Sequence, residues 1–164
     1  MIFVTVGNMD PFDRLIKAMD EWVGKQATPL EVLAQIGTGS YRPTNLQFVD
    51  FLKPEEYRDA FERAEFIVSH AGTGSIITAL ENDKPMVIMP KRASLGEQRN
   101  EHQLATATRF KPSTLIQVAY DVDELYAILN EAAFNTEKKV FQPQAWPPDA
   151  SLISFIRGFI QAGS

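Results

Sequence analysis

The chain alternates between short apolar runs and longer segments in which apolar residues recur every three or four positions. A short apolar run bounded by glycine, proline or polar residues is typical of a buried parallel strand, whereas the longer spacing is typical of a helix with one face on a sheet. The pattern predicts strands at residues 2–6, 30–36, 46–52, 66–69, 86–89 and 115–118. It predicts helices at residues 11–23, 54–64, 74–82, 97–110, 121–133 and 151–161.

Strands that alternate with helices indicate an α/β protein built on a single Rossmann-like, doubly wound parallel sheet. We expect residues 1–133 to form this domain. Residues 134–150 carry several prolines, which block a helix, so we expect a strap there. Residues 151–164 are then expected to form a C-terminal amphipathic helix. In a sheet of this kind, ligands bind at the carboxyl ends of the strands.

Acidic residues stand where the pattern begins two of the helices. Asp10 is expected to cap the first helix, with Pro11 at its first helical position. The sequence DVD at 121–123 has the Asp-x-Asp spacing of metal-dependent sugar transferases, but an acidic helix cap is the better interpretation. The charged residues of the predicted helix at 54–64 are interpreted as a solvated face.

Composition narrows the class of protein. The 164 residues are 45% hydrophobic and 23% charged, which suits one globular domain. The net charge of −5 argues against broad nucleic-acid binding, although it is compatible with a nucleotide in one pocket. The chain has no cysteine, so it has neither disulfides nor a thiolate metal site. No apolar run reaches the roughly twenty residues that a membrane span needs, so we expect a cytoplasmic protein.

The predicted strand at 66–69 runs into the sequence HAGTGS, where the chain turns before a helix. Gly72 and Gly74 let the backbone approach a ligand, and the helix N-terminus presents free N–H groups and the positive end of its dipole, which predicts an anion site. His70 is either a satisfied core histidine or a hydrogen-bond donor to phosphate. A third glycine and a G-x-S-x-G elbow are both absent, so neither an NAD site nor a serine hydrolase is expected.

A second group of polar residues follows the predicted strand at 86–89. Sugar hydroxyls are bound by planar donors and acceptors such as carboxylates and amides, and this segment contains both. The alternative is an ordinary solvated loop, and the residues alone leave both interpretations open. The residues concerned are Lys91, Arg92, Glu97, Arg99, Glu101, His102 and Gln103.

Together these segments resemble the C-terminal, donor-binding half of glycosyltransferase family 28. The resemblance is carried by SHAGTGSIITALENDKP at 69–85, PKR at 90–92 and GEQRNEHQLA at 96–105, with VGNMDPFDRLI at 6–16 and QIGTGSY at 35–41. Within the family, the chain is similar to the small catalytic subunits of split transferases. These are the exopolysaccharide glucuronosyltransferase subunits of the PssE type and the catalytic subunits of dolichol-linked N-acetylglucosaminyltransferases.

The resemblance implies the C-terminal half of a GT-B glycosyltransferase, which takes a UDP-sugar as donor, needs no metal or other cofactor, and transfers the sugar with inversion. UDP-glucuronate is one donor that it suggests, because a sugar carboxylate would suit Lys91, Arg92 or Arg99. It places uracil against the backbone of Phe51 and Leu52. The residues that it places at the diphosphate are Gly7, Asn8, Gly72, Thr73, Gly74 and Ser75, with His70 beside them as the catalytic residue, and Glu101, His102 and Gln103 at the sugar hydroxyls.

One position departs from the family pattern. Relatives place a glutamate eight residues after the histidine to bind both ribose hydroxyls, whereas this chain has Thr78 there. A threonine holds one hydroxyl at best, and Glu81, one helical turn further on, is a candidate substitute.

The resemblance also implies a partner. The base that activates the acceptor usually lies on the other GT-B half, so we expect a membrane-anchored partner subunit that brings a lipid-linked glycan acceptor and keeps this chain peripheral to the membrane. The C-terminal helix is expected either to dock on that partner or to pack on its own domain. A non-catalytic nucleotide-sugar-binding or interaction module is the alternative function, and a one-domain epimerase is disfavoured by length.

Overall fold

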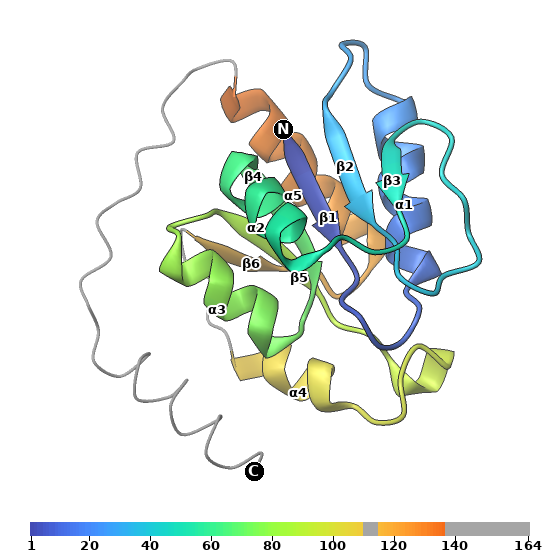
Figure 1. Ribbon diagram of the computed structural model, residues 1–164. Coiled ribbons are helices and arrows are strands. Elements are labelled where there is room, and N and C mark those ends of the chain that lie inside the picture. Colours follow the sequence, from blue (N-terminus) through green and yellow to red (C-terminus); the bar gives the residue numbers. More distant parts are fainter. Residues whose placement is uncertain (110–114, 137–164) are drawn as a thin grey trace.

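A computed structural model describes residues 1–109 and 115–136. Within these ranges the protein has a six-stranded, entirely parallel sheet of order β3-β2-β1-β4-β5-β6 (Figure 1). The strands are β1 (Ile2–Thr5), β2 (Val32–Gln35), β3 (Gln47–Val49), β4 (Phe66–His70), β5 (Met86–Met89) and β6 (Ile116–Val118). The helices are α1 (Asp13–Gly24), α2 (Pro54–Arg63), α3 (Thr73–Glu81), α4 (His102–Arg109) and α5 (Val122–Thr136), with a 3-10 turn η1 (Ala93–Leu95).

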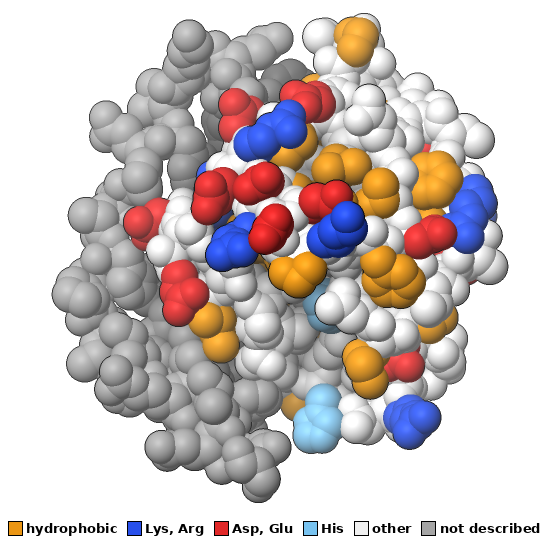
Figure 2. Space-filling view, in the orientation of Figure 1, with side chains coloured by type: hydrophobic (Ala, Val, Ile, Leu, Met, Phe, Trp, Pro, Cys, Tyr) orange, Lys and Arg blue, Asp and Glu red, His pale blue; other side chains and the backbone are white. Residues whose placement is uncertain are grey.

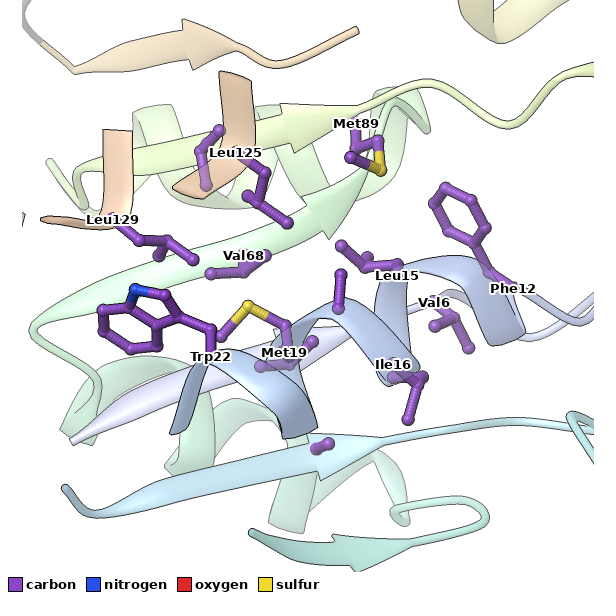
Figure 3. Close-up of a cluster of buried hydrophobic side chains, with 14 of the residues drawn as sticks. Val6, Phe12, Leu15, Ile16, Met19, Trp22, Val68, Met89, Leu125 and Leu129 are labelled. Carbon is purple, nitrogen blue, oxygen red and sulfur yellow. The ribbon is translucent and has the colours of Figure 1, made fainter. Parts of the chain in front are cut away.

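Helices cover both faces of the sheet, which confirms the predicted doubly wound α/β fold. The helices α1 and α5 cover one face, where Trp22 and Leu129 pack over Val68 (Figure 3). The helices α2 and α3 cover the other face, where Phe61 and Ile76 belong to a second buried cluster. Successive strand residues point to opposite faces, so the central strands β1, β4 and β5 are buried on both sides and are largely apolar, whereas the edge strand β3 is mostly exposed.

Two predictions about surface and cap residues are confirmed. The charged residues of α2 are exposed and form a group of mixed sign on the face shown in Figure 2, as expected for a solvated face. At the start of α5, the Asp121 carboxylate accepts a hydrogen bond of 2.8 Å from the Glu124 N–H. Asp121 is therefore a helix cap, as the sequence predicted.

The predicted start of α1 was wrong. The helix begins at Asp13, because Phe12 has a non-helical backbone and occupies the N-cap position without a side-chain cap bond. Pro11 and Asp10 therefore lie before the helix. The carboxylate of the first helical residue, Asp13, does not cap the helix. It accepts hydrogen bonds from the N–H and hydroxyl of Ser40, so the first turn of α1 anchors the loop that follows β2.

Other boundaries also differ from the prediction. The helix expected from residue 97 begins at His102, because the chain first forms η1 and then turns at Gly96, whose φ is +70°. The helix expected to end at residue 133 continues to Thr136. The predicted strap at 134–150 otherwise lies outside the described residues, as does the predicted C-terminal helix at 151–164.

A buried carboxylate in α1 holds the loop before β3. Asp20 is 1% exposed and accepts hydrogen bonds from the N–H groups of Thr44 and Asn45 at 3.0 and 2.6 Å and from the Tyr41 hydroxyl at 2.8 Å. Burial alone raises the pKa of the Asp20 carboxyl, but these hydrogen bonds outweigh burial and bring the pKa below its ordinary value. The ionised carboxylate is therefore the form that this fold stabilises.

Replacing Asp20 by asparagine is expected to lower the free energy of unfolding by about 2 to 3 kcal/mol at pH 7, because charge-assisted hydrogen bonds are lost. Since the folded pKa is the lower one, the wild-type carboxylate contributes stability above the unfolded pKa of about 3.9 and loses it as the pH falls through the folded pKa. Urea unfolding from pH 7 to pH 3 should show the two proteins converging at acid pH. A constant difference over that range would contradict the assignment.

Candidate functional site

The order of the strands places the candidate site. Strands β1 and β4 are neighbours with Thr5 opposite Ser69, and the chain leaves β1 toward β2 on one side and β4 toward β5 on the other. A crevice forms where the strand order reverses in this way, at the carboxyl ends of the two strands. The residues that follow β1 and β4 therefore meet at one edge, although they are far apart in the sequence.

His70 fills the space between the two loops at this edge. A Cβ atom on Gly7 would lie 2.8 Å from His70 Nε2, and a Cβ atom on Gly72 would lie 2.2 Å from the same atom. Gly7 also has a φ of +79°, a conformation that side chains disfavour. Both glycines are therefore needed to admit the imidazole ring, a requirement that the sequence analysis did not anticipate.

The environment of His70 keeps its ring neutral. Burial is the main cause that lowers the pKa of His70, the nearby Lys91 charge adds to it, and a hydrogen bond with the backbone of Thr5 opposes both, which leaves the pKa at about 4. The Ser69 hydroxyl lies 3.2 Å from His70 Nδ1. A neutral imidazole has one N–H group. When Nδ1 accepts the Ser69 hydroxyl, that group is on Nε2 and can donate to an anion, and the ring has no second proton to release near neutral pH.

The His70 pKa has a consequence for stability. The unfolded chain takes up a proton on this histidine near pH 6.5, whereas the folded protein does so only near pH 4, so stability falls by about 2 to 3 kcal/mol as the pH drops between these values. We expect the variant His70→Gln to lack this fall, as measured by denaturant unfolding at pH 7 and pH 4.5. His102→Gln, which changes an exposed histidine, is the control and should keep it.

The N-terminus of α3 opens onto the same edge. Gly72 is its N-cap residue and, because glycine has no side chain, it cannot cap the free N–H groups of the first turn. Within residues 1–109 and 115–136, the N–H groups of Thr73, Gly74 and Ser75 have no recorded partner. A Cβ atom on Gly74 would have nothing within 4 Å, so the helix end is approachable there. Free N–H groups at an open helix end favour an anion.

Gln103, the second residue of α4, joins the glycine turn to the loop after β5. Its Oε1 atom accepts hydrogen bonds of 3.1 Å from both the Ala71 N–H and the Lys91 N–H. The structure thus brings together His70 and Gln103, which the sequence separates by more than thirty residues.

The loop after β5 is also held by a residue that the sequence analysis missed. Arg14 of α1 forms a bidentate ion pair with Glu97, with Nε–Oε1 and Nη2–Oε2 distances of 2.7 and 2.9 Å. The Glu97 carboxylate also accepts the Arg92 N–H at 2.9 Å. Glu97 is therefore a structural anchor of this loop. An arginine among the apolar positions that begin α1 was the available signal.

A buried glutamine connects two further parts of the edge. Gln35 is 1% exposed, donates from Nε2 to Asn8 Oδ1 at 3.1 Å, and accepts the Leu52 N–H at Oε1 at 3.0 Å. The Leu52 N–H is therefore occupied, whereas the neighbouring Phe51 is 50% exposed. The sequence analysis did not single out Gln35, although a polar residue at the end of an apolar strand run was a usable signal.

The remaining predicted residues occupy different surroundings. The Arg92 guanidinium donates to the Tyr120 carbonyl at 2.7 Å, and its buried Nε has no partner within the described residues. Glu101 and His102 are exposed, and Glu101 accepts the Ser94 N–H at 3.2 Å. The Thr78 hydroxyl donates to the Gly74 carbonyl at 2.9 Å.

Membrane-spanning helices and clustered metal ligands are both absent from residues 1–109 and 115–136. None of the helices there has the length and apolar character needed to cross a membrane. In the same part of the chain, no three histidine, aspartate or glutamate side chains are grouped as metal ligands would be.

Comparison with known proteins identifies the family. The model of the glycosyltransferase family 28 C-terminal domain matches residues 1–145. The Homo sapiens UDP-N-acetylglucosamine transferase subunit ALG13 is 31% identical over 115 residues, which cover 65% of this chain and 10% of the relative. The Eremothecium gossypii protein of the same name is 39% identical over 74 residues, which cover 44% of this chain and 34% of the relative. The chain spans about a third or less of the curated relatives it matches.

Solved structures agree on the fold. The glycotransferase of kitacinnamycin has a TM-score of 0.58 at 20% identity, over 98% of this chain and 39% of the other. The calicheamicin glycosyltransferase CalG4 has a TM-score of 0.56 at 14% identity, over 80% of this chain and 33% of the other. At these identities the likeness concerns the fold alone. With a family match over most of its length, the chain belongs to the glycosyltransferase family 28 C-terminal domain family and has the fold of the C-terminal half of a GT-B glycosyltransferase.

Proposed function

We propose that this chain is the catalytic, donor-binding subunit of a two-component, metal-independent, inverting glycosyltransferase. It moves a sugar from a UDP-sugar to a lipid-linked acceptor. Family membership supports the reaction class, and the names of the curated relatives support the UDP-sugar and the subunit character. The observation that carries the proposal is the meeting of the His70 turn and Gln103 at the switch point of the sheet.

The diphosphate is proposed to lie over Gly7 and the N-terminus of α3. Breaking the bond between the sugar and the diphosphate leaves negative charge on the leaving group. Free N–H groups at the helix end and the neutral His70 ring stabilise that charge as it develops. Asn8, which Gln35 fixes, extends the same surface.

The sugar is proposed to lie against Gln103, Glu101 and His102. Because the Gln103 Oε1 atom already accepts two N–H groups, its Nε2 group is the one that would donate to a sugar hydroxyl. Lys91 is buried, so a carboxylate on the sugar, as in UDP-glucuronate, would have to bind the exposed Arg99 or the partly exposed Arg92.

The acceptor and the base are proposed to come from a partner subunit anchored in the membrane. Residues 1–145 match the C-terminal domain of the family, and GT-B enzymes usually place the base on the other half. Exopolysaccharide synthesis and N-glycan synthesis both use lipid-linked acceptors of the required kind. On this proposal the chain works at the cytoplasmic surface of the membrane.

Isothermal titration with UDP and then with UDP-glucose, UDP-N-acetylglucosamine and UDP-glucuronate tests the donor site. We expect UDP to bind with a micromolar to low-millimolar dissociation constant and one sugar to improve on it. Absence of UDP binding at millimolar concentration would overturn the proposal. Transfer to a lipid-linked acceptor after adding the candidate partner tests the catalytic role.

The second candidate function is a non-catalytic nucleotide-sugar-binding or interaction module. Thr78 favours it, because the threonine hydroxyl donates to Gly74 and only its lone pairs remain for a ribose hydroxyl. Glu81, the candidate substitute, is exposed one turn further along α3. Sugar transfer restored by the partner would exclude the module, whereas UDP binding without transfer in the complete assembly would favour it.

A further inference from the structure

Lys91 is a buried cation beneath the loop after β1. The residue is 2% exposed and is the second residue after the end of β5. Its Nζ donates to the Val6 carbonyl at 3.0 Å and to the Asp10 carbonyl, which flank the loop containing Gly7. The Nζ also lies 5.7 Å from the centre of the Phe12 ring. Lys91 therefore holds both ends of this loop from its inner side.

The charge of Lys91 is not neutralised by a direct ion pair. Within residues 1–109 and 115–136, no carboxylate oxygen lies within 4.0 Å of its Nζ. Burial lowers the pKa of Lys91, and the more distant carboxylates of Asp10 and Glu97 oppose this. A buried charge with incomplete compensation is costly for a fold, and such charges are concentrated at functional sites.

The field of Lys91 reaches the site where the diphosphate is proposed to bind. The Lys91 charge contributes to the low pKa of His70, so the two groups interact electrostatically. The His70 ring in turn lies directly against the backbone of Gly7 and Gly72. A negative ligand placed there would complete the compensation of the buried ammonium group.

We propose that Lys91 is a positioning residue that charges the diphosphate site from beneath. It attracts the anion through the Gly7 loop without contacting the ligand. This inference rests on the proposed function and assigns Lys91 a role different from binding a sugar carboxylate. Because this attraction is electrostatic, the contribution of Lys91 to ligand affinity should grow with the negative charge of the ligand.

The test compares uridine, UMP and UDP, which carry increasing negative charge, on wild type and on Lys91→Met. We expect uridine affinity to change by less than about twofold and UDP affinity to fall by about tenfold or more, with UMP between them. Lys17→Met is the matched control, because it removes one exposed positive charge of α1 that is paired with Glu21 on the helix surface. An equal loss for all three ligands would overturn the inference.

A second measurement on the wild-type protein does not depend on the variant folding. NMR of protein labelled at the lysine Cε carbons follows the titration of Lys91 with and without UDP. The titratable and charged groups around Lys91 are Asp10, Glu97, His70 and Arg14, whose guanidinium donates to the adjacent Pro90 carbonyl and lies over the same Phe12 ring. By reciprocal linkage, UDP should raise the Lys91 pKa by about one unit or more, which a merely structural lysine would not show. If UDP binds and this pKa is unchanged, the inference alone fails; if UDP does not bind, the proposed function fails with it.

Discussion

Replacing Gln103 by leucine is expected to lower UDP-sugar affinity by about 10- to 100-fold. The side chain keeps its approximate size, but the N–H groups of Ala71 and Lys91 lose their shared acceptor. An unpaired donor in a partly buried place costs about 1 to 3 kcal/mol, and about 1.4 kcal/mol corresponds to a tenfold change in affinity. The glycine turn and the loop after β5 then lose their fixed relation. Isothermal titration and thermal unfolding measure the two effects.

Gln103→Glu is the matched variant, because a carboxylate can still accept both N–H groups. We expect its unfolding temperature to stay close to that of wild type. Its affinity for UDP-sugar should remain low, since the amide donor is gone and the added negative charge lies near the diphosphate. Wild-type affinity in both variants would contradict the placement of the donor site at this edge.

The fold could be predicted because its signals are local. Each strand that is buried on both faces reads as an apolar run, and each helix between strands shows an apolar stripe. The turn from His70 to Ser75 was recognisable for the same reason, since glycines and a helix start lie within a few residues. Helix ends were harder to place. The start of α1 is set by the non-helical backbone of Phe12, and the first helical residue, Asp13, binds Ser40 in a distant loop.

The connections within the site could not be predicted from the sequence. Lys91 reads as a loop cation, yet it is buried because the loop after β1 closes over it. Glu97 is compatible in the sequence with either a sugar ligand or a solvated loop, yet Arg14 from α1 binds its carboxylate. Gln35 has the pattern of an ordinary strand residue, yet its side chain connects the loop after β1, through Asn8, to the loop after β3, through Leu52. All three depend on which strands are neighbours, and strand order is not encoded in any local pattern.

Replacing Gly72 by alanine is expected to lower the free energy of unfolding by about 2 to 3 kcal/mol, because overpacking of a filled site costs about that much. The new methyl group would lie 2.2 Å from His70 Nε2, and the ring would have to leave its place beside Gly7. UDP affinity should fall in parallel, since the displaced ring and the disturbed start of α3 both face the proposed diphosphate site. Denaturant unfolding and titration with UDP measure the two losses.

Two comparisons separate the clash with His70 from a general effect of alanine on the turn. Gly74→Ala places its methyl group in open space two residues further on and within α3, so stability should not fall and the higher helix propensity of alanine should raise it by up to about 1 kcal/mol. In a His70→Ala background the ring is absent, and Gly72→Ala should then cost little. A double-mutant cycle gives this coupling directly. If Gly72→Ala costs the same with and without the imidazole, the ring does not occupy the space between the two glycines, and the proposed donor site loses its central feature.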